Sequence, residues 1–378
     1  ALFDCDKEFF ASTDECIARI GRRAVAGRAV LLKGAREYRF EKLAHALARK
    51  SHTTVLEVDL DAMIHNLNYF RSHLRPGVRL VAMVKAGSYG AGDFEVAQML
   101  QHQGVDYLAV AFADEGVLLR ERGIMMPVVV LNADADSFDQ MIANRLEPEI
   151  YSFRSLADFA DAVSHAGETR YPVHIKLDTG MHRLGFMEGE IGRLCEVLPT
   201  LPAVKVASVF SHLNCADMPE EDAYTREQIA RYDRMSAAVA ASLPYSVIRH
   251  TANSAAIERF PEARFDMCRL GLGLYGFGWE HNAGLRPVSA LKTRIVQIKR
   301  LEAGDAVGYG RAGKLLRPTV TATVPIGYAD GLDRHLGCGR WSMRVAGRPA
   351  PIVGRVCMDS CMIDVTDTHA QEGDAVII

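Results

Sequence analysis

The sequence predicts an α/β protein in which a (β/α)8 barrel of the TIM type is followed by an all-β domain. Between residues 79 and 276, short apolar runs alternate eight times with helical stretches of 10 to 25 residues. The runs are continuously hydrophobic, as is typical of parallel strands covered on both faces. Eight strand–helix units in about 200 residues favour a barrel over the alternative, an open doubly wound sheet.

The expected barrel strands are short and bounded by polar or turn-forming residues, as strands of a parallel sheet usually are. In chain order they are RLVAMVK (79–85), YLAVAF (107–112), PVVVLN (127–132), EPEIYS (147–152), VHIKLD (173–178), VKVASVFSH (204–212), SVIRHTA (246–252) and FDMCRLG (265–271).

After Gly284 the helical periodicity disappears, and apolar runs are separated by Gly, Pro and Asp instead. We therefore expect the barrel over residues 53–284 and an all-β domain over residues 285–378. The sequence stops at EGDAVII, inside an expected strand, so we expect the β domain to be incomplete. Its other expected strands lie in residues 290–301, 319–329, 341–349 and 350–365.

The first 52 residues form a separate segment that is too small to bury a core of its own. Residues 12–26 predict a capped helix, residues 29–34 a strand and turn, and residues 37–50 a second amphipathic helix. We expect residues 1–52 either to be the tail of a domain that lies upstream or to pack as an appendage.

Composition argues against several classes of partner. The formal charge is −3 and no basic run is interleaved with aromatic residues, so we expect no nucleic acid. No apolar stretch approaches the ~20 residues that span a bilayer, so we expect no membrane segment. The opening ALFDCDKEFF lacks the pattern of a signal peptide. We expect a cytoplasmic protein.

The eight cysteines include no C-x-x-C pair and no His/Cys cluster at zinc spacing. We therefore expect reduced thiols and no metal site. Cys357 and Cys361 are expected on one strand, on the same face but too far apart for a disulfide.

Lys85 is the first candidate functional residue, because it ends the first barrel strand and a glycine-rich turn follows it. The carboxyl ends of barrel strands face the active site. A lysine there is either a surface charge or a nucleophile that forms a Schiff base. Polar residues also end later strands: Lys176, Asp178, His182 and Arg183 after strand five, His212 after strand six, Ser254 after strand seven and Arg269 on strand eight.

A hydroxyl after strand seven and a glycine-rich turn after strand eight mark the usual phosphate site of barrels, although such turns also occur as plain loops. A nucleophilic lysine beside a phosphate site suggests pyridoxal phosphate. Seven motifs then closely resemble the alanine racemases, over residues 53–378. They are VKAGSYGAG, KLDTGMHRLG, HTANSA, RLGLGLYG, VGYGR, PIGYADG and GRVCMD.

The resemblance implies a pyridoxal-phosphate enzyme that interconverts L- and D-alanine for peptidoglycan synthesis. Lys85 matches the lysine that binds the cofactor covalently and serves one face of the substrate, and Tyr309 matches the acid/base of the other face. In the family that tyrosine comes from the second subunit, so a homodimer with shared sites is implied. The remaining cofactor positions are Tyr89, His212, Ser254, Arg269 and the backbone of Gly271 and Leu272.

The substrate positions follow from the same resemblance. Arg183 matches the residue that orients the substrate carboxylate, Met358 a contribution from the partner subunit, and Tyr328 a residue of the narrow entrance. Lys176 matches a lysine that is carbamylated in some members, with an ordinary polar lysine as the alternative. His182 is expected to fill a variable position rather than to act in catalysis.

Three features depart from the family or extend it. Gly87 stands where Asp or Asn is common, and Ala91 where His is common, so the cofactor loop is atypical. A phosphate-binding tyrosine of the family would lie beyond Ile378. Residues 30–47 resemble the end of the Mur ligase that adds D-alanyl-D-alanine, which implies a ligase/racemase fusion. A non-catalytic cofactor carrier and a related decarboxylase remain the alternative functions.

Overall fold

The computed structural model describes residues 8–20, 30–33, 38, 40–47, 53–279 and 284–378. The chain divides into two compact units, residues 56–290 and residues 1–55 with 291–378, and each is described by itself. The predicted fold class is confirmed, because the first unit is a parallel barrel and the second contains an antiparallel sheet.

All eight predicted barrel strands are present, in the spatial order β8-β7-β6-β5-β4-β3-β2-β9. The ends of this order meet, since the N–H groups of Asp266 and Arg269 donate to the carbonyls of Arg249 and Ala252, both at 3.0 Å. The alternative of an open sheet is therefore wrong. The strands are β2 (Arg79–Met83), β3 (Tyr107–Val110), β4 (Val128–Val130), β5 (Glu147–Ile150), β6 (Tyr171–Lys176), β7 (Val204–Phe210), β8 (Ile248–His250) and β9 (Met267–Leu270).

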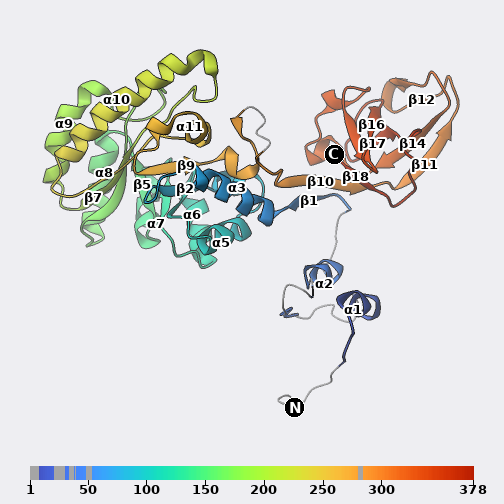
Figure 1. Cartoon of the computed structure of the whole chain (residues 1–378), viewed down its shortest axis with the longest axis horizontal. Helices are drawn as coiled ribbons and strands as arrows, with labels where there is room; N and C mark the ends of the chain where they lie inside the picture. The colour runs from blue at the N-terminus through green and yellow to red at the C-terminus, as the bar shows by residue number, and fades with distance from the viewer. Residues whose placement is uncertain (1–7, 21–29, 34–37, 39, 48–52, 280–283) are drawn as a thin grey trace. The chain divides into compact units, whose positions relative to one another are not determined.

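Helices alternate with these strands (Figure 1), and their apolar faces pack on the outer side of the sheet around Phe70, Phe159 and Tyr232. The short strand β1 (Val55–Val58) precedes the first of these helices in the sequence. The helices are α3 (Leu60–Ser72), α4 (Lys85–Tyr89), α5 (Phe94–His102), α6 (Ala113–Glu121), α7 (Phe138–Ala143), α8 (Phe153–His165), α9 (Ile191–Val197), α10 (Asp222–Ala241) and α11 (Ser254–Arg259). The 3-10 turns are η3 (Ala135–Ser137), η4 (Glu188–Glu190), η5 (Leu198–Thr200), η6 (Pro219–Glu221), η7 (Pro261–Ala263) and η8 (Leu272–Tyr275).

Two groups of buried side chains fill the inside of the barrel. Residues at alternate positions of a strand share one face, so each strand sends every second side chain inward. The apolar cluster consists of Val81, Met83, Ala109, Val129 and Met267. The polar cluster consists of Glu149, His174, Lys176, Ser208, His250 and Arg269.

The second unit holds an antiparallel sheet with the order β10-β18-β15-β16-β17-β14-β11. Its core includes Val324, Met343, Ile352 and Ile363, which are fully buried. The strands are β10 (Ser289–Arg294), β11 (Gln297–Leu301), β14 (Thr319–Val324), β15 (Ser342–Val345), β16 (Arg348–Val353), β17 (Cys361–Asp364) and β18 (Ala375–Ile377), with a separate pair, β12 (Ala306–Val307) and β13 (Gly313–Lys314). Short turns are η10 (Tyr309–Arg311), η11 (Tyr328–Asp330) and η12 (Arg334–Leu336).

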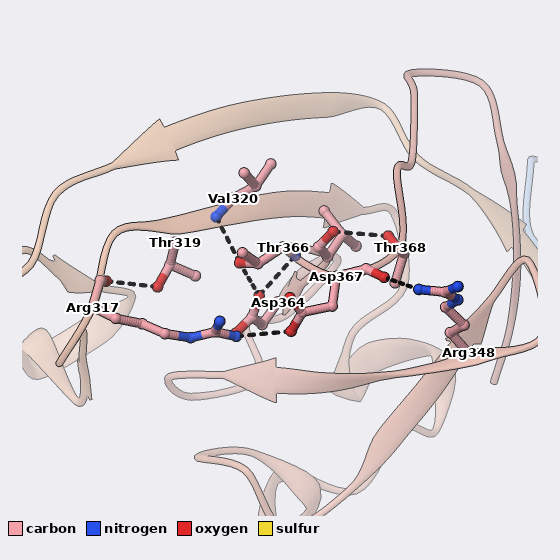
Figure 2. Close-up of polar contacts among 9 residues, drawn as sticks. Arg317, Thr319, Val320, Arg348, Asp364, Thr366, Asp367 and Thr368 are labelled. Carbon is pink, nitrogen blue, oxygen red and sulfur yellow. Dashed lines mark hydrogen bonds and ion pairs between the residues drawn. The ribbon is translucent and has the colours of Figure 1, made fainter.

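Figure 2 shows a polar cluster that fixes the turn after β17. Asp364 accepts the backbone N–H of Thr366 at 2.9 Å, and the Thr366 hydroxyl in turn accepts the N–H of Val320. Arg317 lies 3.0 Å from Asp367 and 3.5 Å from Asp364, with its side chain largely exposed. These contacts hold β14 and the turn together at the surface.

The described parts of the N-terminal segment contain two short helices, α1 (Thr13–Arg19) and α2 (Phe40–Leu47). Ser12 caps α1 as expected, and Lys42 of α2 lies 3.3 Å from Asp14. The strand predicted over residues 29–34 is wrong for residues 30–33, which belong to no strand, while residues 29 and 34 lie outside the described ones.

Cysteines require one further correction. Cys361 lies on β17, but Cys357 lies in the loop before it, so the predicted shared strand is wrong. The chain turns at residues 358–360, where the N–H of Cys357 donates to the carbonyl of Ser360 at 3.0 Å. In the described ranges every cysteine is free, and no group of three His, Cys, Asp or Glu could hold a metal ion. None of the described helices is long and apolar enough to cross a membrane.

Candidate active site

Lys85 begins an unusual turn at the carboxyl end of β2. Residues Ala86, Gly87 and Ser88 have left-handed backbone angles, with φ of 51°, 60° and 53°, and Tyr89 follows at 56°. Such angles cost roughly 1–2 kcal/mol for each residue that is not glycine. Backbone hydrogen bonds offset part of this cost, among them Ser88 N–H to Val84 O and Gly90 N–H to Ala86 O, both 3.0 Å.

Glu115 ties this turn to the neighbouring βα loop. Its carboxylate accepts the N–H of Ala86 at 2.6 Å through one oxygen. The other oxygen accepts the N–H groups of Ala111 at 2.6 Å and Phe112 at 3.2 Å. An ionised acceptor shared by three N–H groups stabilises a backbone that would otherwise be strained. Glu115 therefore fixes where the Lys85 turn lies, a role that the sequence motifs did not reveal.

Tyr89 and the turn after β9 lie against one another. The Tyr89 ring packs 4.7 Å from the ring of Tyr275, whose hydroxyl donates to the carbonyl of Met83 at 2.9 Å. A Cβ at Gly271 would lie 3.3 Å from the Tyr89 hydroxyl oxygen. Burial raises the pKa of Tyr89, so its phenol stays protonated at neutral pH.

Ser254 faces the same glycine-rich turn from the start of α11. Its Oγ accepts the N–H of Gly271 at 3.0 Å and the N–H of Gly273 at 3.2 Å. A Cβ at Gly273 would lie 2.3 Å from the Phe70 ring, so only glycine fits there. Leu272, between the two glycines, is half exposed. The predicted phosphate residues thus lie together in one cradle, in which the Ser254 hydroxyl holds the glycine-rich turn.

Arg269 is a buried cation of the site, with 6% of its surface exposed. Its Nη2 donates to the carbonyls of Ser211 at 2.6 Å and Thr251 at 3.0 Å. The Nδ1 atoms of His250 and His212 lie 3.0 Å and 3.3 Å from its guanidinium nitrogens. Burial lowers the pKa of Arg269 to about 10, so it remains charged at pH 7.

The two histidines beside Arg269 are neutral. Burial, and after it the charge of Arg269, lowers the pKa of His212 and of His250 well below the ordinary value. Because a guanidinium only donates, each histidine presents a lone pair of Nδ1 to it. His212 lies at the mouth, and His250 lies deeper in the barrel.

Lys176 pairs with Glu149 inside the barrel, at 3.5 Å between Nζ and Oε1. Both side chains are buried, and the amine also lies 4.3 Å from the centre of the Phe210 ring. Burial lowers the pKa of Lys176 to about 8, while Glu149 opposes that shift. Burial likewise raises the pKa of Glu149. From the sequence, Glu149 is expected only within a strand, and no sequence motif predicts its place in the site.

A cavity of about 560 Å³ opens at the carboxyl ends of the barrel strands. It brings together every predicted site residue of the barrel unit. Those residues are Lys85, Tyr89, Lys176, Arg183, His212, Ser254, Arg269, Gly271 and Leu272. His182 is not among the lining residues; its ring lies 3.3 Å from Asp178 and is exposed.

The other three predicted residues lie in the second unit. Tyr309 is 70% exposed and stands between Gly308 and Gly310, which have φ of 79° and 67°. The loops of Tyr328 and Met358 are neighbours, because the N–H of Ala329 donates to the carbonyl of Met358 at 2.9 Å. Both side chains are partly exposed.

The cavity has the donor set that pyridoxal phosphate requires. Lys85 supplies an amine at one end, and the Ser254 hydroxyl, which accepts two N–H bonds and keeps its own hydrogen to donate, suits a phosphate. Arg269 supplies a permanent donor for a ring nitrogen. The missing side chain of Gly271 leaves the backbone open toward Tyr89. The residues present therefore fit the cofactor.

Known proteins resemble this chain over most of its length. The alanine racemase N-terminal domain matches residues 58–278, and the alanine racemase C-terminal domain matches residues 288–378. An alanine racemase of Clostridium kluyveri is 35% identical over 334 residues, 85% of this chain and 83% of the relative. One of Desulfovibrio desulfuricans is 37% identical over 330 residues, 85% of this chain and 88% of the relative.

Solved structures show the same fold. The alanine racemase of Clostridium difficile 630 superposes with a TM-score of 0.81 at 33% identity, over 87% of each chain. That of Bartonella henselae, solved with covalently bound pyridoxal phosphate, gives a TM-score of 0.77 at 27% identity, over 86% of this chain and 90% of the other.

Proposed function

The chain belongs to the alanine racemase family, and we propose that it interconverts L- and D-alanine with Lys85 and Tyr309 as its two proton carriers. As a member of that family it is a pyridoxal-phosphate-dependent amino-acid racemase. The observation that carries the proposal is the convergence of Lys85, Arg269 and the Ser254 cradle on one cavity.

Pyridoxal phosphate supplies an electron-withdrawing system that acidifies the Cα–H bond of a bound amino acid. Lys85 would hold the cofactor covalently, and the Ser254 hydroxyl, with the backbone of Gly271 and Leu272, would bind its phosphate. Arg269 would donate a hydrogen bond to the ring nitrogen and keep its own proton, because its pKa is about 10. His212 and Tyr89 would flank the ring and the phosphate.

Racemisation requires a proton carrier on each face of Cα. The Lys85 amine would remove or return the proton on one face, and the Tyr309 phenol on the other. We propose that Tyr309 comes from a second copy of the chain, in a closed homodimer with two shared sites. The exposed phenol, held on a glycine-flanked turn, supports this role.

Alanine is small, and we propose that it is held by few groups. Arg183 lines the cavity and would bind the substrate carboxylate. Tyr328 and Met358, whose loops are hydrogen-bonded neighbours, would narrow the entrance from the partner subunit. A narrow pocket of this kind disfavours side chains larger than a methyl group.

We propose that Lys176 is carbamylated. A pKa of about 8 leaves part of the amine neutral near pH 7, and the neutral form is the one that reacts with CO2. A carbamate on Lys176 would place a second anionic group beside Glu149. Burial raises the pKa of Glu149, so this carboxyl group can be protonated and need not repel the carbamate. Intact-protein NMR with labelled CO2 would show a carbamate carbon in the native chain and none in Lys176→Arg.

Trapping and activity together test the proposed function. Borohydride should fix pyridoxal phosphate on Lys85, and purified protein should form D-alanine from L-alanine. Lys85→Ala should lose both properties, whereas the matched surface variant Lys299→Ala should keep both. Label on another lysine would refute the cofactor assignment. Release of CO2 instead of D-alanine would indicate a decarboxylase, and labelling without turnover would indicate a cofactor carrier.

The wider role is also a proposal. The relatives named above are bacterial, and a cytoplasmic enzyme that supplies D-alanine for peptidoglycan synthesis suits them. We propose domain limits of 1–52, 53–284 and 285–378, with the first segment as the end of a fused Mur ligase. Isolating the natural chain tests the fusion, because a fused product would be far heavier than 41.6 kDa and would bind ATP.

A further inference from the structure

A continuous chain of hydrogen bonds crosses the interior of the barrel beneath the cavity. It begins at Arg269, whose Nη1 lies 3.0 Å from Nδ1 of His250. Nε2 of His250 lies 3.0 Å from Oγ of Ser208. That hydroxyl lies 2.6 Å from Nδ1 of His174, and Nε2 of His174 lies 2.8 Å from a carboxylate oxygen of Glu147.

The five members come from five neighbouring strands, β9, β8, β7, β6 and β5. Arg269, His250, Ser208 and His174 are buried, and Glu147 closes the chain at the first residue of β5, with 13% of its side chain exposed. Arg269 lines the cavity at the mouth, so the chain connects the mouth of the barrel to its opposite end.

The two ends allow only one direction for the protons of this chain. A guanidinium donates and never accepts, and an ionised carboxylate accepts and never donates. His250 must therefore accept at Nδ1 and donate from Nε2 to Ser208. The Ser208 hydroxyl must then donate to Nδ1 of His174, which donates from Nε2 to Glu147. Every member is satisfied in this arrangement.

The opposite tautomer of His250 would place an N–H group against an N–H group of Arg269. Two donors facing each other at 3.0 Å repel, and neither finds an acceptor in the buried interior. A doubly protonated His250 is excluded as well, since burial and the charge of Arg269 lower its pKa. The direction set at Glu147 thus decides whether Nη1 of Arg269 has a partner.

We propose that Glu147, His174 and Ser208 are positioning residues that fix the tautomer of His250 and thereby aim Arg269 at the cofactor ring nitrogen. The proposal rests on the assignment of Arg269 made under the proposed function. The carbonyls of Ser211 and Thr251 accept from Nη2, and His250 supplies the acceptor for Nη1, so the bond to His250 completes the alignment of the guanidinium. Glu147 acts on the site from the far end of the barrel without touching substrate or cofactor.

Two variants interrupt the chain of hydrogen bonds at different points. Ser208→Ala removes the central hydroxyl and leaves one histidine on each side without its partner. Glu147→Gln keeps the shape of the side chain but can present either an oxygen or an amide N–H to His174, so both directions become possible. Ser208→Thr restores a hydroxyl at the centre and serves as the rescue variant. Ser236→Ala is the control, because it removes a buried serine of α10 that is not part of the chain of hydrogen bonds.

Nitrogen-15 NMR of the histidine rings, in cofactor-free and cofactor-loaded protein, reads the tautomer of His250 directly. We expect one tautomer, protonated at Nε2, in the unmodified protein, in Ser208→Thr and in Ser236→Ala. Ser208→Ala and Glu147→Gln should show a mixture of both. In loaded protein the same two variants should also racemise about tenfold more slowly, the loss expected when a hydrogen bond to a charged group is misaligned.

The proposal is overturned if His250 keeps its single tautomer in either interrupting variant that folds, as judged by circular dichroism. It is also overturned if the tautomer mixes while racemisation by the same variant stays at the unmodified rate. The NMR result on cofactor-free protein stands whether or not Lys85 and Tyr309 act as proposed, so failure of the proposed function is recognised separately, by an inactive unmodified enzyme.

Discussion

Two clusters of side chains fill the barrel, and they are stabilised in different ways. The apolar cluster is held by burial alone, and Met267, one of its members, is fully buried. Each member of the polar cluster needs a specific partner, as Lys176 needs Glu149 and Arg269 needs His250. Burial shifts the pKa of Lys176, His250 and Arg269. The polar cluster therefore costs free energy of folding but supplies groups with the shifted pKa values that are typical of active sites.

The largest stability effect is expected in the apolar cluster. Met267→Ala should lower the free energy of unfolding by about 2–5 kcal/mol, because it removes a fully buried side chain and leaves a cavity. Urea unfolding measures this change. Met125→Ala, at a side chain that is 79% exposed, is the control and should stay near the unmodified value. Equal effects of the two substitutions would mean that the apolar cluster does not stabilise the barrel.

A substitution in the polar cluster should instead change how the free energy of unfolding depends on pH. Lys176 loses its proton near pH 8 when folded, whereas its ordinary pKa is 10.5. The cost of burying this cation is therefore fully present below pH 8 and fades as the pH rises through 10.5. From this group alone, the free energy of unfolding should rise by about 3 kcal/mol across that interval.

Lys176→Met should abolish that rise, measured as the difference from unmodified protein in urea unfolding under CO2-free conditions. Lys299→Met removes an exposed amine and should leave the rise intact. The same slope in Lys176→Met and unmodified protein would show that the buried amine does not titrate in this interval.

A smaller effect, on cofactor binding, is expected at the end of β2, where Lys85 follows the apolar cluster. Glu115→Gln weakens the acceptor that holds Ala86, Ala111 and Phe112, so the Lys85 turn should loosen. The dissociation constant of the cofactor should rise about tenfold. Equilibrium dialysis with pyridoxal phosphate measures it, and Glu121→Gln at the end of α6 is the control. Unchanged affinity would mean that Glu115 does not position the Lys85 turn for cofactor binding.

The smallest effect is expected for charges outside the barrel. Arg317→Ala breaks the exposed ion pairs of Figure 2 and should leave the free energy of unfolding almost unchanged, because solvent screens exposed charges. Thermal unfolding of the full chain checks this. A loss as large as that of Met267→Ala would mean that exposed charges stabilise the protein as much as buried side chains do.

The sequence was sufficient for the eight barrel strands because their hydrophobic runs are local signals. Candidate residues such as Lys85 and Arg269 could be found for the same reason, since each ends or occupies an expected strand. Glu149 and Glu115 were missed. Their partners lie 27 and 29 residues away, at Lys176 and Ala86, and only the strand register and loop positions bring them together.

Two local errors have a similar cause. The run over residues 29–34 has strand-like composition, but its described residues have no pairing partner, and strands require one. Cys357 was placed on a strand by its apolar neighbours, whereas the chain turns at residues 358–360. The hydrogen-bonded chain from Arg269 to Glu147 combines both difficulties, because its members are scattered over five strands and look like ordinary strand residues.

Mixing two inactive variants tests most directly whether each site combines Lys85 of one chain with Tyr309 of another. In a mixed dimer of Lys85→Ala and Tyr309→Phe, one site carries both substitutions and the other carries neither. Subunit exchange between equal amounts should therefore restore alanine racemisation to about a quarter of the unmodified activity. If the exchanged mixture stays as inactive as its two parents, the two residues do not meet across a subunit interface.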